Sequence, residues 1–276
     1  MGVWMRALLS GLLVLASLVL GTAAFSAAWL ERNVVAAEGF AALGEPLGRD
    51  PGFQAELREA LAQQAADSAN VPGPLAGLVA PAVERVLQGL QEAPGYGEAW
   101  TESLEASHQR TFSADDAGPA PAVLDLSPLA RLATERIGED LGVPLPAPGD
   151  VVADVGPATD WPARIASLAG TWPALAVGAG LGALLALAVA RRRGAALAWL
   201  GAGVVVVGAV LWFAAGAVPS LAADQAGASP VASAFAAGLA EQAAASLHGW
   251  LIPALLGGGI LLVLGLLGMA LAPRRR

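Results

Sequence analysis

Three consecutive arginines, Arg191 to Arg193, stand between two long uncharged and mostly apolar runs, 165–190 and 195–215. A transmembrane helix needs about 20 consecutive apolar residues, so each run is long enough to cross a bilayer. An excess of arginine in a short loop keeps that loop on the cytoplasmic side. The sequence therefore predicts a transmembrane hairpin, with helices at 167–190 and 195–215 joined by a cytoplasmic turn at 191–194.

Two further uncharged runs, 7–29 and 249–271, lie near the ends of the chain and predict two more transmembrane helices. Arg6 precedes the first run, and the tail at 272–276 follows the second. With four crossings and this charge pattern, both termini are expected to be cytoplasmic in the plasma membrane. The residues that set this topology, besides the arginine turn, are Arg274, Arg275 and Arg276.

The run at 7–29 also permits a second interpretation, a cleaved signal peptide. Ala24, Ser26 and Ala28 provide the small residues that a signal peptidase requires. A signal peptide has an apolar region of about 7–15 residues, and this run is longer, which favours a retained span. Both interpretations export the segment that follows.

Acidic residues are concentrated between the first two predicted spans. Residues 31–165 hold 21 of the 23 acidic residues and eight arginines, a net charge of −13. Only 14% of the chain is charged, whereas soluble domains have about 25%. An acidic chain does not suit nucleic acid, because phosphate binding needs a basic surface. Residues 30–165 are therefore expected to form an extracytoplasmic domain in contact with water rather than with nucleic acid.

Patterns within this domain predict mainly helix. Asp50-Pro51 has the form of a helix start, with Asp50 as the N-cap and Pro51 at the first helical position. Short strands are expected at 122–126 and 151–155, and they could pair as a small β-hairpin. The predicted fold class is a mainly α membrane protein with four transmembrane helices and a mostly helical extracytoplasmic domain.

The segment 216–247 is expected to be an extracytoplasmic loop that contains an amphipathic helix at 230–247. That helix could lie on the bilayer, dock on the extracytoplasmic domain, or run directly into the fourth span. In the second span, Gly178 and Gly182 form a GxxxG pattern, which predicts a helix-packing face. The glycine-rich faces also permit a homo-oligomer.

Few residues have the chemistry of a catalytic or metal site. The chain has no cysteine, which excludes disulfides and thiolate sites, and it has two histidines. His108 and Glu105 are three residues apart on one predicted helix, so they are the candidate metal ligands, with a carboxylate from elsewhere. His108 also lies in an apolar stripe with Trp100 and Phe112, and this position favours a core role. We predict no cofactor and no catalytic residue.

The layout resembles a group of uncharacterised multi-span membrane proteins of actinobacteria. The matching residues are Phe40 to Leu47, read as Phe-x-x-Leu-x-x-Pro-Leu, then Asp50-Pro51, Trp100 and His108. The resemblance implies one span, a helical extracytoplasmic domain and further spans. It implies no activity and no site residue.

These patterns predict a non-enzymatic protein of the cell envelope. Its exported domain is expected to bind, sense or scaffold, with a protein or cell-wall partner on the outer face. The central parts of the four spans hold no acidic, basic or histidine residue, whereas ion and proton pathways usually require such groups. The alternatives are a membrane-bound metal-dependent enzyme and an accessory subunit of a transporter.

Overall fold

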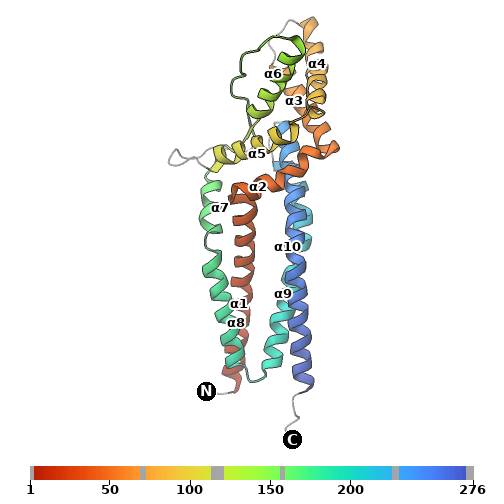
Figure 1. Ribbon diagram of the computed structural model, residues 1–276. Coiled ribbons are helices and arrows are strands. Elements are labelled where there is room, and N and C mark those ends of the chain that lie inside the picture. The colour runs from red at the N-terminus through yellow and green to blue at the C-terminus, as the bar shows by residue number, and fades with distance from the viewer. Residues whose placement is uncertain (1–2, 69–72, 113–120, 156–158, 226–229, 272–276) are drawn as a thin grey trace. The chain divides into compact units, whose positions relative to one another are not determined.

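The computed structural model describes residues 3–68, 73–112, 121–155, 159–225 and 230–271. The chain divides into two compact units. We call the first, Met1–Arg32 with Ile165–Ala217 and Ala245–Arg276, the helix bundle, and the second, Asn33–Arg164 with Val218–Ala244, the helical domain. The elements in Figure 1 are α1 (Val3–Leu30), a π-helical turn (Glu31–Val35), α2 (Ala37–Gly44), a 3-10 turn (Glu45–Arg49), α3 (Pro51–Ser68), α4 (Gly73–Gln91), α5 (Tyr96–Phe112), β1 (Val123–Asp125), α6 (Ser127–Leu141), β2 (Val152–Asp154), α7 (Trp161–Ala169), α8 (Trp172–Val189), α9 (Arg193–Gln225) and α10 (Pro230–Ala270).

Four helices are long and apolar enough to cross a membrane: Trp4–Val35, Trp172–Val189, Arg193–Leu221 and Pro230–Ala270. This confirms the predicted set of four apolar helices. Their large apolar side chains point outward from the bundle; Phe213, for example, is 80% exposed. Such an outer surface would be unstable in water and is the surface that a transmembrane protein presents to lipid.

Helices α1 and α8 lie antiparallel in the bundle and pack through small residues. The Ser17 hydroxyl donates to the Ala179 carbonyl at 2.7 Å, and the Ser10 hydroxyl donates to the Ala186 carbonyl at 3.2 Å. A Cβ on Gly182 would meet Ser17 at 3.4 Å, and one on Gly178 would meet a Leu20 methyl at 3.4 Å. The GxxxG pair therefore faces α1, which confirms the predicted packing face.

Helices α9 and α10 approach each other even more closely. A Cβ on Gly201 would lie 2.3 Å from the Leu262 nitrogen, and a Cβ on Gly265 would lie 2.3 Å from the Ala198 nitrogen. Glycine is required at both positions, because backbone atoms of the facing helix occupy the space of a side chain. At these two positions the backbones of α9 and α10 are thus in direct contact.

Two predicted boundaries differ from the structure. The second span, expected at 167–190, is divided into α7 and α8, because the chain bends at Gly170–Thr171 and Pro173 cannot donate a hydrogen bond back to the preceding turn. The expected loop at 216–247 is helical wherever it is described: α9 continues to Gln225 and α10 begins at Pro230. The amphipathic segment at 230–247 therefore runs directly into the fourth span as one helix.

The core of the helical domain is built from large side chains. Trp100 and Leu104 of α5 are fully buried among Phe53 of α3, Leu124 of β1 and Phe235 of α10. The α10 segment that enters this core is the predicted amphipathic stripe. Residues of α3, α5, β1 and α10 therefore share one hydrophobic core.

The start of α3 is held as its sequence predicts. The Asp50 carboxylate accepts a hydrogen bond from the Phe53 backbone N–H at 2.8 Å, so Asp50 is the N-cap and Pro51 occupies the first helical position. This cap sets the direction in which Phe53 enters the core.

The two short strands pair as predicted. β1 and β2 are antiparallel, with Leu124 opposite Ala153. They do not form the hairpin that was expected, because α6 and a proline-rich segment at 143–149 lie between them. The two strands are therefore joined by a long connection that contains a helix, and not by a tight turn.

Candidate functional site

His108, the first candidate ligand, lies in the core of the helical domain and is 7% exposed. Its Nε2 is 3.1 Å from the Val34 carbonyl oxygen, and because a carbonyl can only accept, Nε2 carries the proton. The ring stacks on Phe112, with ring centroids 4.5 Å apart, and lies tilted against Phe40, with ring centroids 5.4 Å apart. The imidazole is therefore enclosed by aromatic rings and held by a backbone carbonyl.

Glu105, the second candidate, is exposed on the same helix. Burial separates the two side chains, since one faces the core and the other faces solvent. Among the described residues, no three His, Asp or Glu side chains come close enough to hold a metal ion. Within the described part of the chain, His108 and Glu105 are thus not brought together with a third ligand.

The predicted topology residues fall into two groups. Arg191, Arg192 and Arg193 are exposed at the connection from α8 to α9, where Arg193 begins α9. Arg274, Arg275 and Arg276 lie outside the described residues.

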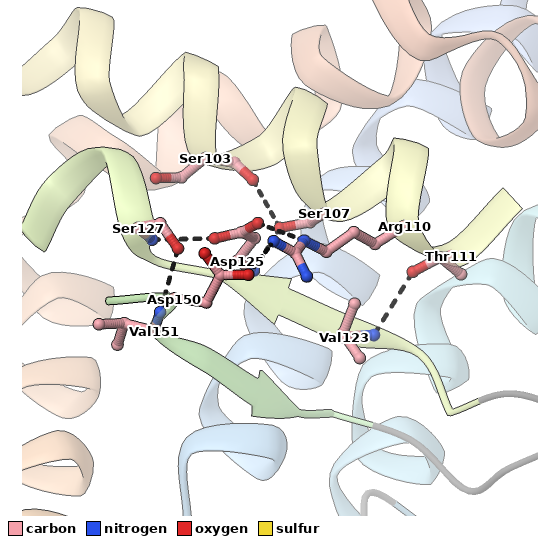
Figure 2. A network of polar contacts seen from close by, with 9 residues as sticks. All are labelled: Ser103, Ser107, Arg110, Thr111, Val123, Asp125, Ser127, Asp150 and Val151. Atoms are coloured by element: carbon pink, nitrogen blue, oxygen red, sulfur yellow. Dashed lines mark hydrogen bonds and ion pairs between the residues drawn. The ribbon is translucent and has the colours of Figure 1, made fainter. Parts of the chain in front are cut away.

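A buried carboxylate that the sequence did not single out lies at the centre of the polar network shown in Figure 2. Asp125 ends β1 and is 3% exposed. One carboxylate oxygen lies 2.6 Å from Nε of Arg110, and the other accepts from the Ser127 backbone N–H at 2.9 Å. Arg110 also binds the Asp150 carboxylate at 2.7 Å. One guanidinium therefore joins α5 to the end of β1 and to the segment that leads into β2.

Backbone groups complete this network. The Asp125 N–H donates to the Ser107 hydroxyl at 2.8 Å, and that hydroxyl donates to the Ser103 carbonyl at 2.5 Å. The Ser127 hydroxyl accepts from the Val151 N–H at 3.0 Å. Figure 2 shows that these residues meet from α5, from β1, from the start of α6 and from the segment that leads into β2. The network thus holds the edges of the small sheet against α5.

The ionisation of Asp125 follows from these contacts. Burial by itself would raise the pKa of this carboxyl, but the hydrogen bonds from Ser127 and the charge of Arg110 outweigh it, and the pKa lies below its ordinary value. The hydrogen bond to Asp150 and the charge of Asp125 raise the pKa of Arg110. A carboxylate held ionised in this way is a poor general acid at neutral pH, which favours a structural role.

Part of this network had a sequence signal. Asp125 stands two residues before Ser127 in Asp-Leu-Ser-Pro, a pattern in which an aspartate accepts from the backbone two residues on. Its pairing with Arg110 had none, because the two residues come from separate elements and the ion pair exists only once β1 lies along α5.

A second polar cluster is built on Gln54 of α3. Its side-chain oxygen accepts from the Tyr96 hydroxyl at 2.6 Å and from the Gln91 amide at 2.8 Å, and its own amide donates to the Leu47 carbonyl at 2.8 Å. Burial raises the pKa of Tyr96 to about 12. The cluster satisfies buried polar groups where α3, α4 and α5 meet, so its role is structural.

Aromatic side chains gather at the end of the bundle opposite the arginine turn. The Trp29 indole N–H donates to the Ser246 hydroxyl at 3.3 Å, and Trp250 packs edge-on against Phe25 at 6.2 Å. Arg32 lies over the Trp250 ring at 5.7 Å. Tryptophan is enriched where a transmembrane helix meets the headgroups, so these residues mark one membrane interface of the bundle.

No protein family model, curated protein or solved structure matches this chain. The function is therefore inferred from the chemistry of the chain itself.

Proposed function

We propose that this chain is a non-enzymatic plasma-membrane protein whose helical domain lies on the extracytoplasmic side and binds a protein partner. Both termini and the Arg191–Arg193 turn are then cytoplasmic. The proposal rests on the charge distribution, on the state of the buried ionisable groups, and on an exposed apolar surface of the domain.

The packing of α1 against α8 brings arginines from two parts of the chain to the same end of the bundle. The contact of Ser10 with Ala186 places Arg6 beside the end of α8, where Arg191 follows. Arg6 and Arg191 to Arg193, which are far apart in sequence, thus lie at one end of the antiparallel helices, while Trp29 and Trp250 lie at the other end of the bundle. This is the asymmetry that the positive-inside rule uses to orient a membrane protein.

The ionisable groups buried in the domain core serve structural contacts. His108 is bound to a backbone carbonyl, and Asp125 is paired with Arg110. A general acid or base needs a free partner in a cleft, and a metal site needs converging ligands. The described part of the domain therefore offers a better basis for binding than for catalysis.

The observation that carries the binding proposal is an apolar strip on α4. Leu78, Ala82 and Val86 recur every four residues on one face, and Leu78 is 64% exposed and Val86 48% exposed. Near the C-terminal end of the same helix, Leu90 is buried in the core of the domain. Exposed apolar surface that a domain leaves uncovered is a common mark of a protein-binding site. We call Leu78, Ala82 and Val86 the α4 strip.

The orientation can be tested by cysteine labelling, because the chain has no native cysteine. Gln63→Cys, exposed on α3, and Arg192→Cys, in the arginine turn, would be expressed in intact cells and treated with a membrane-impermeant maleimide. We expect labelling at position 63 only, and labelling at both after permeabilisation. Labelling at position 192 in intact cells would contradict the proposed orientation.

The binding role can be tested with a photo-reactive residue in the full chain. We expect Val86 replaced in this way to crosslink to one protein in native membranes. The matched control is Glu84, which is exposed on another face of the same helix. The crosslinked partner should also be lost from the Leu78→Ser variant. Equal crosslinking at positions 84 and 86, or none at either, would contradict a binding role for the α4 strip.

A further inference from the structure

A groove opens on the bundle at its arginine-rich end, between α8, α9 and α10. Its volume is about 560 Å3, and its walls include Ala188 of α8, Leu197 of α9 and Leu264 of α10. Arg193, the first residue of α9, lines the same groove and is exposed. The groove therefore combines apolar walls with a cation.

Two glycines line the groove where α9 and α10 meet. They are Gly194 and Gly268, and a Cβ on Gly268 would lie 3.5 Å from the Gly194 Cα. Because neither carries a side chain, the backbones of α9 and α10 approach each other closely beside the groove.

The positive charge at this groove is not neutralised by the described part of the chain. Arg191 and Arg192 are exposed next to Arg193. No acidic residue occurs anywhere between Asp160 and Asp224, nor after Glu241, so α8 and the adjoining parts of α9 and α10 contribute no counter-charge. An anion is therefore the complementary occupant of the arginine end.

The position of the groove selects the kind of anion. The groove lies between helices that are apolar enough to cross a membrane, so its walls face hydrocarbon rather than water. Basic pockets between transmembrane helices on the cytoplasmic side bind the headgroups of anionic lipids. We propose that this groove binds an anionic phospholipid, with an acyl chain along Ala188, Leu197 and Leu264 and the phosphate on Arg193.

A second copy of the chain is a poorer occupant. A symmetric pair that met through this groove would bring two sets of Arg191–Arg193 to the same end of the interface, where like charges repel. The lipid proposal requires that the bundle lie in a bilayer. It rests on the proposed orientation, which puts the arginine end on the cytoplasmic side, but it does not depend on the binding role proposed for the helical domain.

The test uses the purified full chain in detergent micelles and native mass spectrometry. Phosphatidylglycerol and phosphatidylcholine are titrated separately, and the lipid-bound fraction gives an apparent Kd for each. We expect tighter binding of phosphatidylglycerol, and a loss of about tenfold in its affinity for Arg193→Gln, because one charge-assisted contact is removed. Arg191 and Arg192 remain in this variant, so its orientation in the cell membrane should be kept.

The matched control is Arg6→Gln, which removes the same charge from the same end of the bundle without lining the groove. We expect it to change the affinity for phosphatidylglycerol by less than about twofold. Ala188→Phe fills the groove without changing charge and should weaken the binding of both lipids.

Three results would overturn the proposal. They are equal affinity for the two lipids in the unmodified chain, an equal loss for Arg6→Gln and Arg193→Gln, and a photo-reactive residue at position 188 that crosslinks a second copy of the chain instead of lipid.

Discussion

The helix bundle and the helical domain are both mainly helical, but their interiors are built from different residues. In the bundle, helices meet through Gly182, Gly201 and Gly265, and most of the buried apolar residues are alanine. In the helical domain, the interior is filled by large side chains such as Trp100 and Leu104. The same secondary structure thus packs by backbone contact in one unit and by side-chain interdigitation in the other.

The solvent explains this difference. In water, burial of a large apolar side chain contributes roughly 1.5–3 kcal/mol, so a domain gains by filling its core with such residues. In hydrocarbon that gain is absent, because lipid is as apolar as leucine, and close packing of small residues takes its place. Polar residues differ in the same way: the domain buries the Asp125 carboxylate, which pairs with the partly exposed Arg110, whereas the bundle buries serines that bind backbone carbonyls.

Truncation of a core aromatic residue should give the largest effect. Trp100 is 1% exposed, and its indole N–H donates to the Gly44 carbonyl at 2.9 Å. We expect Trp100→Ala to lower the free energy of unfolding of the helical domain by about 3–5 kcal/mol, since it leaves a cavity and an unpaired carbonyl. Pulse proteolysis of the full chain in urea measures this loss. A loss under about 1 kcal/mol would show that side-chain filling is not what stabilises the domain.

A side chain added to the seam where α9 and α10 touch should also destabilise the chain, but by overpacking instead of by leaving a cavity. The Cβ of Gly201→Leu would collide with backbone atoms of α10, and we expect a loss of about 1–3 kcal/mol or more, seen as a lower Tm of the chain in micelles. Gly180→Leu is the matched control, because nothing lies within 4 Å of a Cβ at that position. Equal changes in Tm would mean that the seam tolerates side chains and that the comparison between the units fails.

Loss of the buried carboxylate should have a smaller effect that depends on pH. We expect Asp125→Asn to cost about 1–3 kcal/mol, less than a fully buried pair would, because Arg110 is partly exposed. The folded-state pKa of Asp125 is lowered, so its contribution is present above the unfolded pKa of about 3.9 and is lost as the pH falls through the folded value.

The measurement is the stability of the domain between neutral pH and about pH 3 for both chains. The difference between the unmodified chain and Asp125→Asn should shrink as the pH falls below about 4. A difference that is independent of pH would mean that the ion pair does not stabilise the fold through its charge.

Loss of one buried hydroxyl should give the smallest change. Tyr96→Phe removes the hydrogen bond to Gln54, at a cost of about 0.5–1.5 kcal/mol. The folded pKa of Tyr96 is raised from 10.0 to about 12, so its contribution is present below pH 10 and is lost as the pH rises toward 12. Tyr96 is the sole tyrosine, so the tyrosinate absorbance titrates this side chain alone. A midpoint near 10 would show that the hydroxyl is not buried.

Local patterns were sufficient for much of the fold. The four apolar helices, the capped start of α3 and both short strands were predicted, because each depends on residues that are neighbours in the chain. The continuity of α10 was left open. Its segment at 230–247 is amphipathic and could have ended before the span, and only the core around Phe235 shows where its apolar face packs.

The candidate site shows where local patterns end. His108 and Glu105 share a helix and a spacing that suits a metal, yet one is buried and the other is exposed, because the apolar stripe around Trp100 sets which face of α5 enters the core. Asp125 and Arg110 carry no shared motif. Their ion pair forms because β1 lies along α5.

The sequence by itself determined which segments are apolar enough for a membrane, where arginine and acidic residues accumulate, and which residues begin the helices. These properties follow from composition and from short spacing along the chain. Only the tertiary structure decided that His108 is enclosed by aromatic rings, that Asp125 stays charged in the core, and that Arg193 borders a groove. Each of these depends on which distant segments come into contact, because burial and charge pairing are properties of a packed neighbourhood and not of a single stretch of chain.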